Sequence, residues 1–105
     1  MRFKFKEVVS VNEINGLNYS RDLKGLRISE SPQLASLTGL DTLGKLEAIN
    51  IRGTSIEHLE GIENLSNLES IVLSGNSHLE TLKGIEGCTR ITRLEIQQCP
   101  NLRSL

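Results

Sequence analysis

Two histidines and two cysteines supply the side chains that could bind a metal ion or form a nucleophile–base pair. A zinc site uses four Cys or His ligands, commonly in closely spaced pairs. Neither Cys88 nor Cys99 belongs to a CxxC pair, and no histidine stands at the spacing of a zinc motif from either of them. We therefore expect no metal and no cofactor, and we predict that both cysteines are small buried side chains.

Glycine is the second candidate, because glycine-rich loops cradle phosphate groups. Gly16, Gly39, Gly61 and Gly84 each precede a Leu or an Ile. They are 22 or 23 residues apart rather than gathered in one loop. This period favours a tight turn or a close backbone approach at the same point of a structural repeat, and not a phosphate site.

The aliphatic residues follow the same period. Leu or Ile occupies the first, fourth and sixth positions of four segments, at 23–28, 46–51, 68–73 and 91–96. The alternation of apolar and polar residues within each segment is typical of a strand with one buried face. Four strands are therefore predicted at regular intervals.

After each predicted strand the apolar residues fall three apart, as in Leu34, Leu37, Leu40 and Leu43. That spacing suits a 3₁₀ or loose helical turn that returns the chain to the next strand. One repeat cannot bury its apolar side alone, so successive repeats must stack. The sequence predicts an α/β solenoid with one parallel sheet on its concave face and 3₁₀ turns and loops on its convex side.

We predict a single domain over residues 1–105. Phe3 and Phe5 lie 23 residues before Leu26 and Ile28, so we place them in the same two rows of the solenoid. The predicted divisions are a divergent first repeat at 1–22, full repeats at 23–45, 46–67 and 68–90, and a truncated repeat at 91–105.

These segments resemble the leucine-rich repeat family, whose pattern is L-x-x-L-x-L-x-x-N/C-x-L. The recurrent Gly-Leu or Gly-Ile is most similar to the short-repeat class of bacterial internalins and of a leucine-rich regulatory subunit of protein phosphatase 1. The resemblance covers the whole chain and implies a right-handed superhelix that binds proteins. Only one of the four positions of the family's asparagine ladder is Asn here; the four residues are Ser31, Thr54, Asn76 and Cys99.

Composition and charge narrow the class of partner. The formal net charge is -1, with 12 Lys and Arg against 13 Asp and Glu. This balance and the scarcity of aromatic residues argue against nucleic-acid binding. No apolar run is long enough to cross a bilayer, and the N-terminus lacks the apolar stretch of a secretory signal. We predict a cytoplasmic protein, with export without a cleaved signal as the alternative.

The strand positions between the buried ones should face the concave surface and bind a partner. Six of the 12 basic residues fall on the first three predicted strands, whereas Glu57, Glu60, Glu63, Glu80 and Glu86 are expected on the convex side. The basic cluster would dock an acidic protein surface. Alternatively, its lysines only protect an exposed edge strand from unwanted pairing. The predicted binding residues are Arg2, Lys4, Lys6, Lys24, Arg27, Asn50, Arg52, Val72, Arg93 and Glu95.

The last repeat is half-length and has no polar capping repeat after it, so its apolar end should be exposed. A second copy in a homodimer, or another protein, would cover that end. Alternatively, the half repeat folds down and suffices. The residues concerned are Leu94, Ile96, Leu102 and Leu105.

A short solenoid with one sheet offers an open surface rather than a cleft that excludes water, so we predict no catalytic site. His58 and His78 occupy different positions of the repeat and are expected to be exposed on the convex side. The leading prediction is a non-enzymatic module that docks or masks a partner protein, as a regulator or inhibitor. The alternative is a structural protein that self-associates through its C-terminal end.

Overall fold

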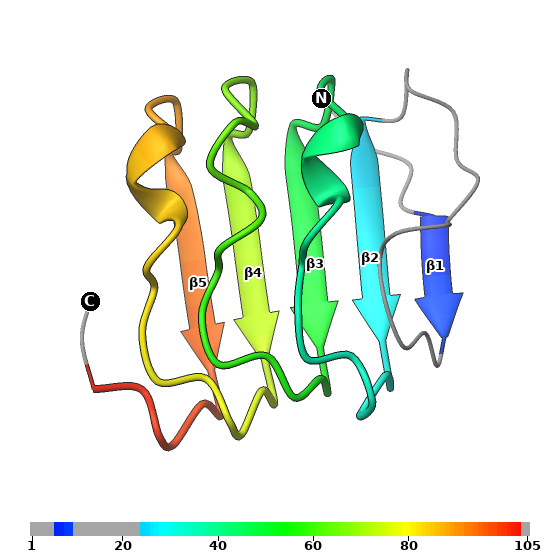
Figure 1. Cartoon of the computed structure of the whole chain (residues 1–105), viewed down its shortest axis with the longest axis vertical. Coiled ribbons are helices and arrows are strands. Elements are labelled where there is room, and N and C mark those ends of the chain that lie inside the picture. The colour runs from blue at the N-terminus through cyan, green and yellow to red at the C-terminus, as the bar shows by residue number, and fades with distance from the viewer. Residues whose placement is uncertain (1–5, 10–23, 104–105) are drawn as a thin grey trace.

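The computed structural model describes residues 6–9, as backbone only, and residues 24–103. They form one parallel sheet in which strands adjacent in sequence are adjacent in space. The return segments between the second and fifth strands pass across the same face of the sheet (Figure 1). The chain is therefore a stacked-coil solenoid. Its strands are β1 (Lys6–Val9), β2 (Gly25–Ser29), β3 (Ala48–Arg52), β4 (Ser70–Ser74) and β5 (Arg93–Gln97).

Strands β2 to β5 pair in the register that the aliphatic repeat predicts, and this prediction is confirmed. One row of paired residues is Leu26, Ile49, Ile71 and Leu94. The other row is Ile28, Ile51, Leu73 and Ile96. Since side chains alternate between the faces of a strand, both rows lie on one face of the sheet.

The return segments complete the core over those two rows. Their apolar residues are enclosed, and Leu37, Leu59 and Ile62 are each no more than 1% exposed. A buried Leu or Ile stabilises a fold by about 1.5–3 kcal/mol. The core runs without interruption from Leu26 to Cys88, so each repeat depends on its neighbours for burial.

Helical structure is limited to two 3₁₀ turns, η1 (Leu40–Thr42) and η2 (Ile85–Gly87). The described residues contain no α-helix, so the predicted alternation of α and β reduces to strands joined by 3₁₀ turns and loops. The cause is the apolar spacing of three, which closes bonds such as Leu43 N to Leu40 O at 3.0 Å and supports no second α-helical turn. Neither turn has the length or apolar character to cross a bilayer, and the rest of the described chain has no helix that does.

The predicted role of the recurrent glycines is confirmed at Gly61 and Gly84. Their φ angles are 118° and 113°, in the left-handed region. A Cβ on Gly61 would lie 2.4 Å from the carbonyl oxygen of Leu37, and a Cβ on Gly84 would lie 2.4 Å from the carbonyl carbon of Leu59. Both glycines therefore allow one return segment to pack directly on the backbone of the previous one. Gly16 lies outside the described residues.

A buried polar ladder connects consecutive repeats beneath the strand ends. Ser31, Thr54 and Asn76 are all at most 3% exposed. The Asn76 amide nitrogen donates to the carbonyl oxygen of Ile51 at 3.0 Å, and its Oδ1 accepts from the Thr54 backbone N–H at 3.1 Å and hydroxyl at 2.8 Å. One asparagine thus satisfies polar groups of the neighbouring repeat that would otherwise be buried without partners.

The first strand differs from the prediction. In β1, Lys6 pairs with Leu26, a separation of 20 residues rather than 23. The predicted placement of Phe3 and Phe5 in the two aliphatic rows is therefore wrong, and both residues lie outside the described part of the chain. The constant period was extended into a segment without the aliphatic pattern. The two valines of β1, which are β-branched and favour strands, lie in the strand instead.

Candidate functional site

The sheet has a second face, opposite the core, which we call the outer face. Its middle row is half-buried from end to end. Exposure increases at the strand ends and at β5, where Arg52, Arg93 and Gln97 are exposed. The middle row is Arg27, Asn50, Val72 and Glu95. The row that ends the strands, the end row, is Ser29, Arg52, Ser74 and Gln97.

The structure brings together six of the predicted binding residues. Four of them make up the middle row. Arg52 and Arg93 flank that row on β3 and β5. Lys24 is exposed immediately before β2.

The basic cluster is smaller than predicted. Lys6 pairs with Leu26, in a row that faces the core in the following strands, and Glu7 takes the position beside Arg27. The prediction for Lys6 is corrected for the same reason as those for Phe3 and Phe5, a shorter first repeat. Arg93 forms an ion pair with Glu95. The other predicted basic residues, Arg2 and Lys4, lie outside the described residues.

The centre of the outer face contains a polar atom without a hydrogen bond. The Oδ1 atom of Asn50 is buried and has no hydrogen-bond partner in the structure described. Its neighbours in the middle row are Arg27 and Val72. A buried acceptor left in this state costs about 1–3 kcal/mol, so its presence on a surface row requires an explanation other than stability.

A hollow opens where the strands end, next to the end row. Its volume is about 220 Å³. The guanidinium of Arg52 contributes to its wall and forms no ion pair with any described residue. We call it the strand-end hollow; its lining residues are Ser29, Glu30, Arg52, Gly53, Ser74, Gly75 and Gln98.

The residue after each strand adopts left-handed backbone geometry in all four repeats. The φ angles are 53° at Glu30, 64° at Gly53, 66° at Gly75 and 54° at Gln98. This geometry continues the ladder past the strands: Gly53 N donates to Ser74 O at 3.1 Å, and Gly75 N to Gln97 O at 3.0 Å. The two central repeats have no side chain at this position, which leaves the hollow open between Glu30 and Gln98.

The strand-end hollow was not predicted from the sequence. The signal was present, because Gly53 and Gly75 are 22 residues apart and directly follow two predicted strands. A glycine at that point of a repeat indicates a left-handed turn. Glu30 and Gln98 hide the pattern in the outer repeats, since both are non-glycine residues with positive φ.

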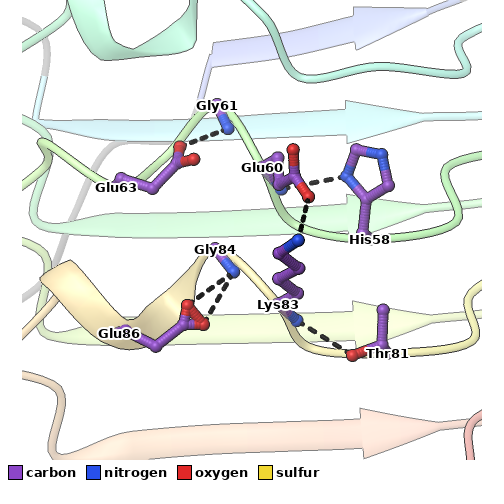
Figure 2. A network of polar contacts seen from close by, with 8 residues as sticks. All are labelled: His58, Glu60, Gly61, Glu63, Thr81, Lys83, Gly84 and Glu86. Carbon is purple, nitrogen blue, oxygen red and sulfur yellow. Dashed lines mark hydrogen bonds and ion pairs between the residues drawn. The ribbon is translucent and has the colours of Figure 1, made fainter.

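Acidic residues lie on the return segments, as predicted, and they bind neighbouring turns. Figure 2 shows two consecutive segments side by side, with Lys83 Nζ 3.5 Å from Glu60 Oε2 across them. Within one segment the Glu63 carboxylate accepts the Gly61 N–H. That hydrogen bond, with the backbone N–H of Glu63 itself, holds the pKa of Glu63 below its ordinary value.

The histidines have structural surroundings on the return side. His58 is half-buried rather than exposed, and its Nδ1 accepts the Glu60 N–H at 3.1 Å (Figure 2). Thr81 fills the same role in the next repeat, where its hydroxyl accepts the Lys83 N–H at 3.2 Å. His78 is exposed, as predicted. His58 therefore closes a turn that threonine closes equally well.

The two cysteines are free thiols in different surroundings. Cys88 is buried, as predicted, and its Sγ donates to the carbonyl oxygen of Ile62 at 3.3 Å. Burial, with the nearby Glu63 and Glu86 carboxylates, raises the pKa of Cys88, so its thiol stays protonated. Cys99 is half-buried rather than buried, because no described repeat packs on the far side of β5. Among the described residues no group of His, Cys, Asp and Glu side chains could hold a metal ion.

The last described repeat exposes apolar surface, as predicted. Leu94 is 41% exposed, whereas its row neighbour Ile71 is 0% exposed. Ile96 and Leu102 are half-buried against the core. Leu105 lies outside the described residues. In the sheet as described, β5 pairs only with β4.

Comparisons with known proteins add no relative: no protein-family model matches the chain, and no curated protein matches it significantly. Its function must therefore be argued from the outer face, the strand-end hollow and the exposed end.

Proposed function

We propose that this chain is a non-enzymatic binding module of the leucine-rich repeat type, in the short-repeat class, and that it docks a partner protein on the outer face of its sheet. The observation that carries the proposal is the middle row of that face. It combines Arg27, Asn50, Val72 and Glu95, all half-buried, on four paired strands. Arginine and apolar side chains surrounded by polar ones are typical of protein interfaces.

The backbone beneath this row is fixed before any partner arrives. Each strand is paired along its length, and the core holds the rows in register. A preorganised surface loses little conformational entropy on binding, which favours affinity. The Oδ1 atom of Asn50 is a further reason, because a donor from a partner would satisfy an acceptor that has no partner within the chain.

The partner should present an acidic surface to this face. Arg27 and Arg52 are its basic residues apart from Arg93, which already pairs with Glu95. The return side is acidic, with residues such as Glu57, Glu80 and Glu86 exposed. Opposite charges on the two sides would orient a charged partner during encounter. Docking there would act by masking the partner, as a regulator or inhibitor does. We place the module in the cytoplasm, where unpaired thiols such as those of Cys88 and Cys99 stay reduced.

A charge-matched pair of variants tests the proposal. Arg27→Glu with Arg52→Glu reverses two charges on the outer face, and Arg90→Glu with Arg103→Glu reverses two exposed charges elsewhere. Both pairs change the net charge equally. A specific partner captured from native lysate should bind the outer-face variant at least about tenfold more weakly, while the control pair retains capture. Circular dichroism confirms that both variants fold. Equal capture by the outer-face variant would contradict the proposal.

A second candidate function is self-association through β5, and the 41% exposure of Leu94 favours it. Two copies related by a two-fold axis at Leu94 would pair their β5 strands antiparallel. That register places Arg93 of each copy opposite Glu95 of the other, an attractive cross-strand pair. Sedimentation velocity at micromolar concentration should then show a dimer that Leu94→Lys dissociates. A monomer across that concentration range would exclude this function.

A further inference from the structure

The strand-end hollow adds a chemical specificity to the outer face. It lies beside the middle row, at the ends of β2 to β4, and has a volume of about 220 Å³. Adjacent strands are about 4.8 Å apart, so the three steps from Glu30 to Gln98 span about 14 Å. A hollow of this size holds one or two side chains of an extended segment, not a whole domain.

The floor of the hollow is backbone that is already bonded. The N–H groups of Gly53 and Gly75 donate to the Ser74 and Gln97 carbonyl oxygens. They are therefore not available to an incoming group. The donors that remain are side chains: the Arg52 guanidinium, the Ser29 and Ser74 hydroxyls and the Gln98 amide.

Arg52 is the one cation in the lining and Glu30 the one anion. A dianionic phosphate would bring more negative charge than this balanced lining can neutralise. A carboxylate brings a single negative charge, and its two oxygens match the planar fork of a guanidinium. Because Arg52 is exposed and has no ion pair with a described residue, it can bind a carboxylate without breaking an existing contact.

We propose that the strand-end hollow binds the carboxylate of an Asp or Glu side chain from an extended segment of the partner protein. Arg52 binds both carboxylate oxygens, and the Ser29 and Ser74 hydroxyls donate from either side. This inference rests on the proposed docking function and names the residue type that the partner contributes.

The test is a titration of the ¹⁵N-labelled full chain, followed by ¹H–¹⁵N correlation spectra. The probe is the blocked tripeptide acetyl-Gly-Glu-Gly-amide. The controls are the same peptide with Gln in place of Glu, and inorganic phosphate, all at equal ionic strength. The Glu peptide should give saturable shifts of the Gly53 and Gly75 amides and of the Arg52 side-chain N–H. The Gln peptide and phosphate should bind at least about tenfold more weakly.

Two arginine variants make the result specific. Arg52→Gln should abolish the saturable shifts at Gly53 and Gly75, and because Arg52 is exposed the variant should fold normally. Arg93→Gln is the matched control, since Arg93 is exposed on the same face but does not line the hollow, and it should keep them. A third variant, Ser74→Ala, should weaken the Glu peptide severalfold.

Shifts that persist in Arg52→Gln, or that the Gln peptide reproduces, would overturn the carboxylate site. Tighter binding of phosphate than of the Glu peptide would overturn it as well. Neither result removes the docking function, which fails only if the Arg27 and Arg52 reversals leave partner capture unchanged.

Discussion

Two columns of glycine run through the solenoid, and they serve opposite purposes. Gly61 and Gly84 on the return side have φ near 115°, and a Cβ on either would meet the backbone of the previous repeat at 2.4 Å. Gly53 and Gly75 at the strand ends have φ of 64° and 66°, but their nearest neighbours would be 3.5 Å and 3.9 Å from a Cβ. The first column permits contact between repeats, whereas the second leaves surface space.

The difference shows that positive φ alone does not tell why a glycine is present. On the return side, two constraints coincide, the left-handed backbone and the absence of space. At the strand ends only the backbone constraint applies, and Glu30 and Gln98 show that other residues can meet it. The strand-end glycines are thus replaceable for folding, and their replacement would change the surface.

The largest effect is expected for Gly84→Ala. The new Cβ would meet the Leu59 backbone, which cannot move without shifting a whole repeat, and the residue would also be strained at φ 113°. We expect a loss of about 3 kcal/mol or more in the free energy of unfolding, measured by urea denaturation. Gly44→Ala is the control, because nothing lies within 4 Å of its Cβ, and it should leave stability nearly unchanged. Similar losses for both variants would show that packing of the return segments is looser than described.

Gly75→Ala should have a smaller effect on stability and a larger one on binding. Its Cβ makes only ordinary contacts, so the cost is that of left-handed backbone, about 1–2 kcal/mol in the free energy of unfolding. The methyl group enters the strand-end hollow and should weaken the Glu tripeptide in the same spectra. A stability loss equal to that of Gly84→Ala would remove the distinction between the two columns.

Gln98→Gly tests the strain carried by a non-glycine residue in the strand-end column. At φ 54° a glycine avoids the Cβ clash, and we expect a net gain of about 0.5 kcal/mol in the free energy of unfolding. Gln97→Gly, one residue earlier and within β5, should instead lose about 0.5–1 kcal/mol. If both variants lose stability, the left-handed backbone at Gln98 imposes no cost.

The smallest effect concerns the hydrogen bond that closes the turn at Gly61. Because the native pKa of Glu63 is lowered, its contribution is present above the ordinary value of 4.5 and is lost as the pH falls through the native pKa. The Tm advantage of the wild type over Glu63→Gln at neutral pH should therefore shrink in acid. A difference in Tm that does not change between neutral and acidic buffer would contradict this assignment.

The aliphatic rows of β2 to β5 were predictable because each strand repeats the same spacing of Leu and Ile, and burial rewards that spacing in every repeat. The middle row of the outer face followed from the same alternation. The register of β1 was not predictable, since its segment lacks the pattern and the period shortens to 20 residues. The strand-end hollow was missed because its outline depends on which side chains are absent, and on the left-handed backbone of Glu30 and Gln98.

The sequence by itself determined the period, the strands and the two rows of buried aliphatic residues, because those depend on local alternation and on the gain from removing apolar surface from water. Only the tertiary structure decided which polar residues became neighbours. Arg52, Ser29 and Ser74 come from three repeats, and only the stacking of those repeats at the spacing of a parallel sheet puts them around one hollow.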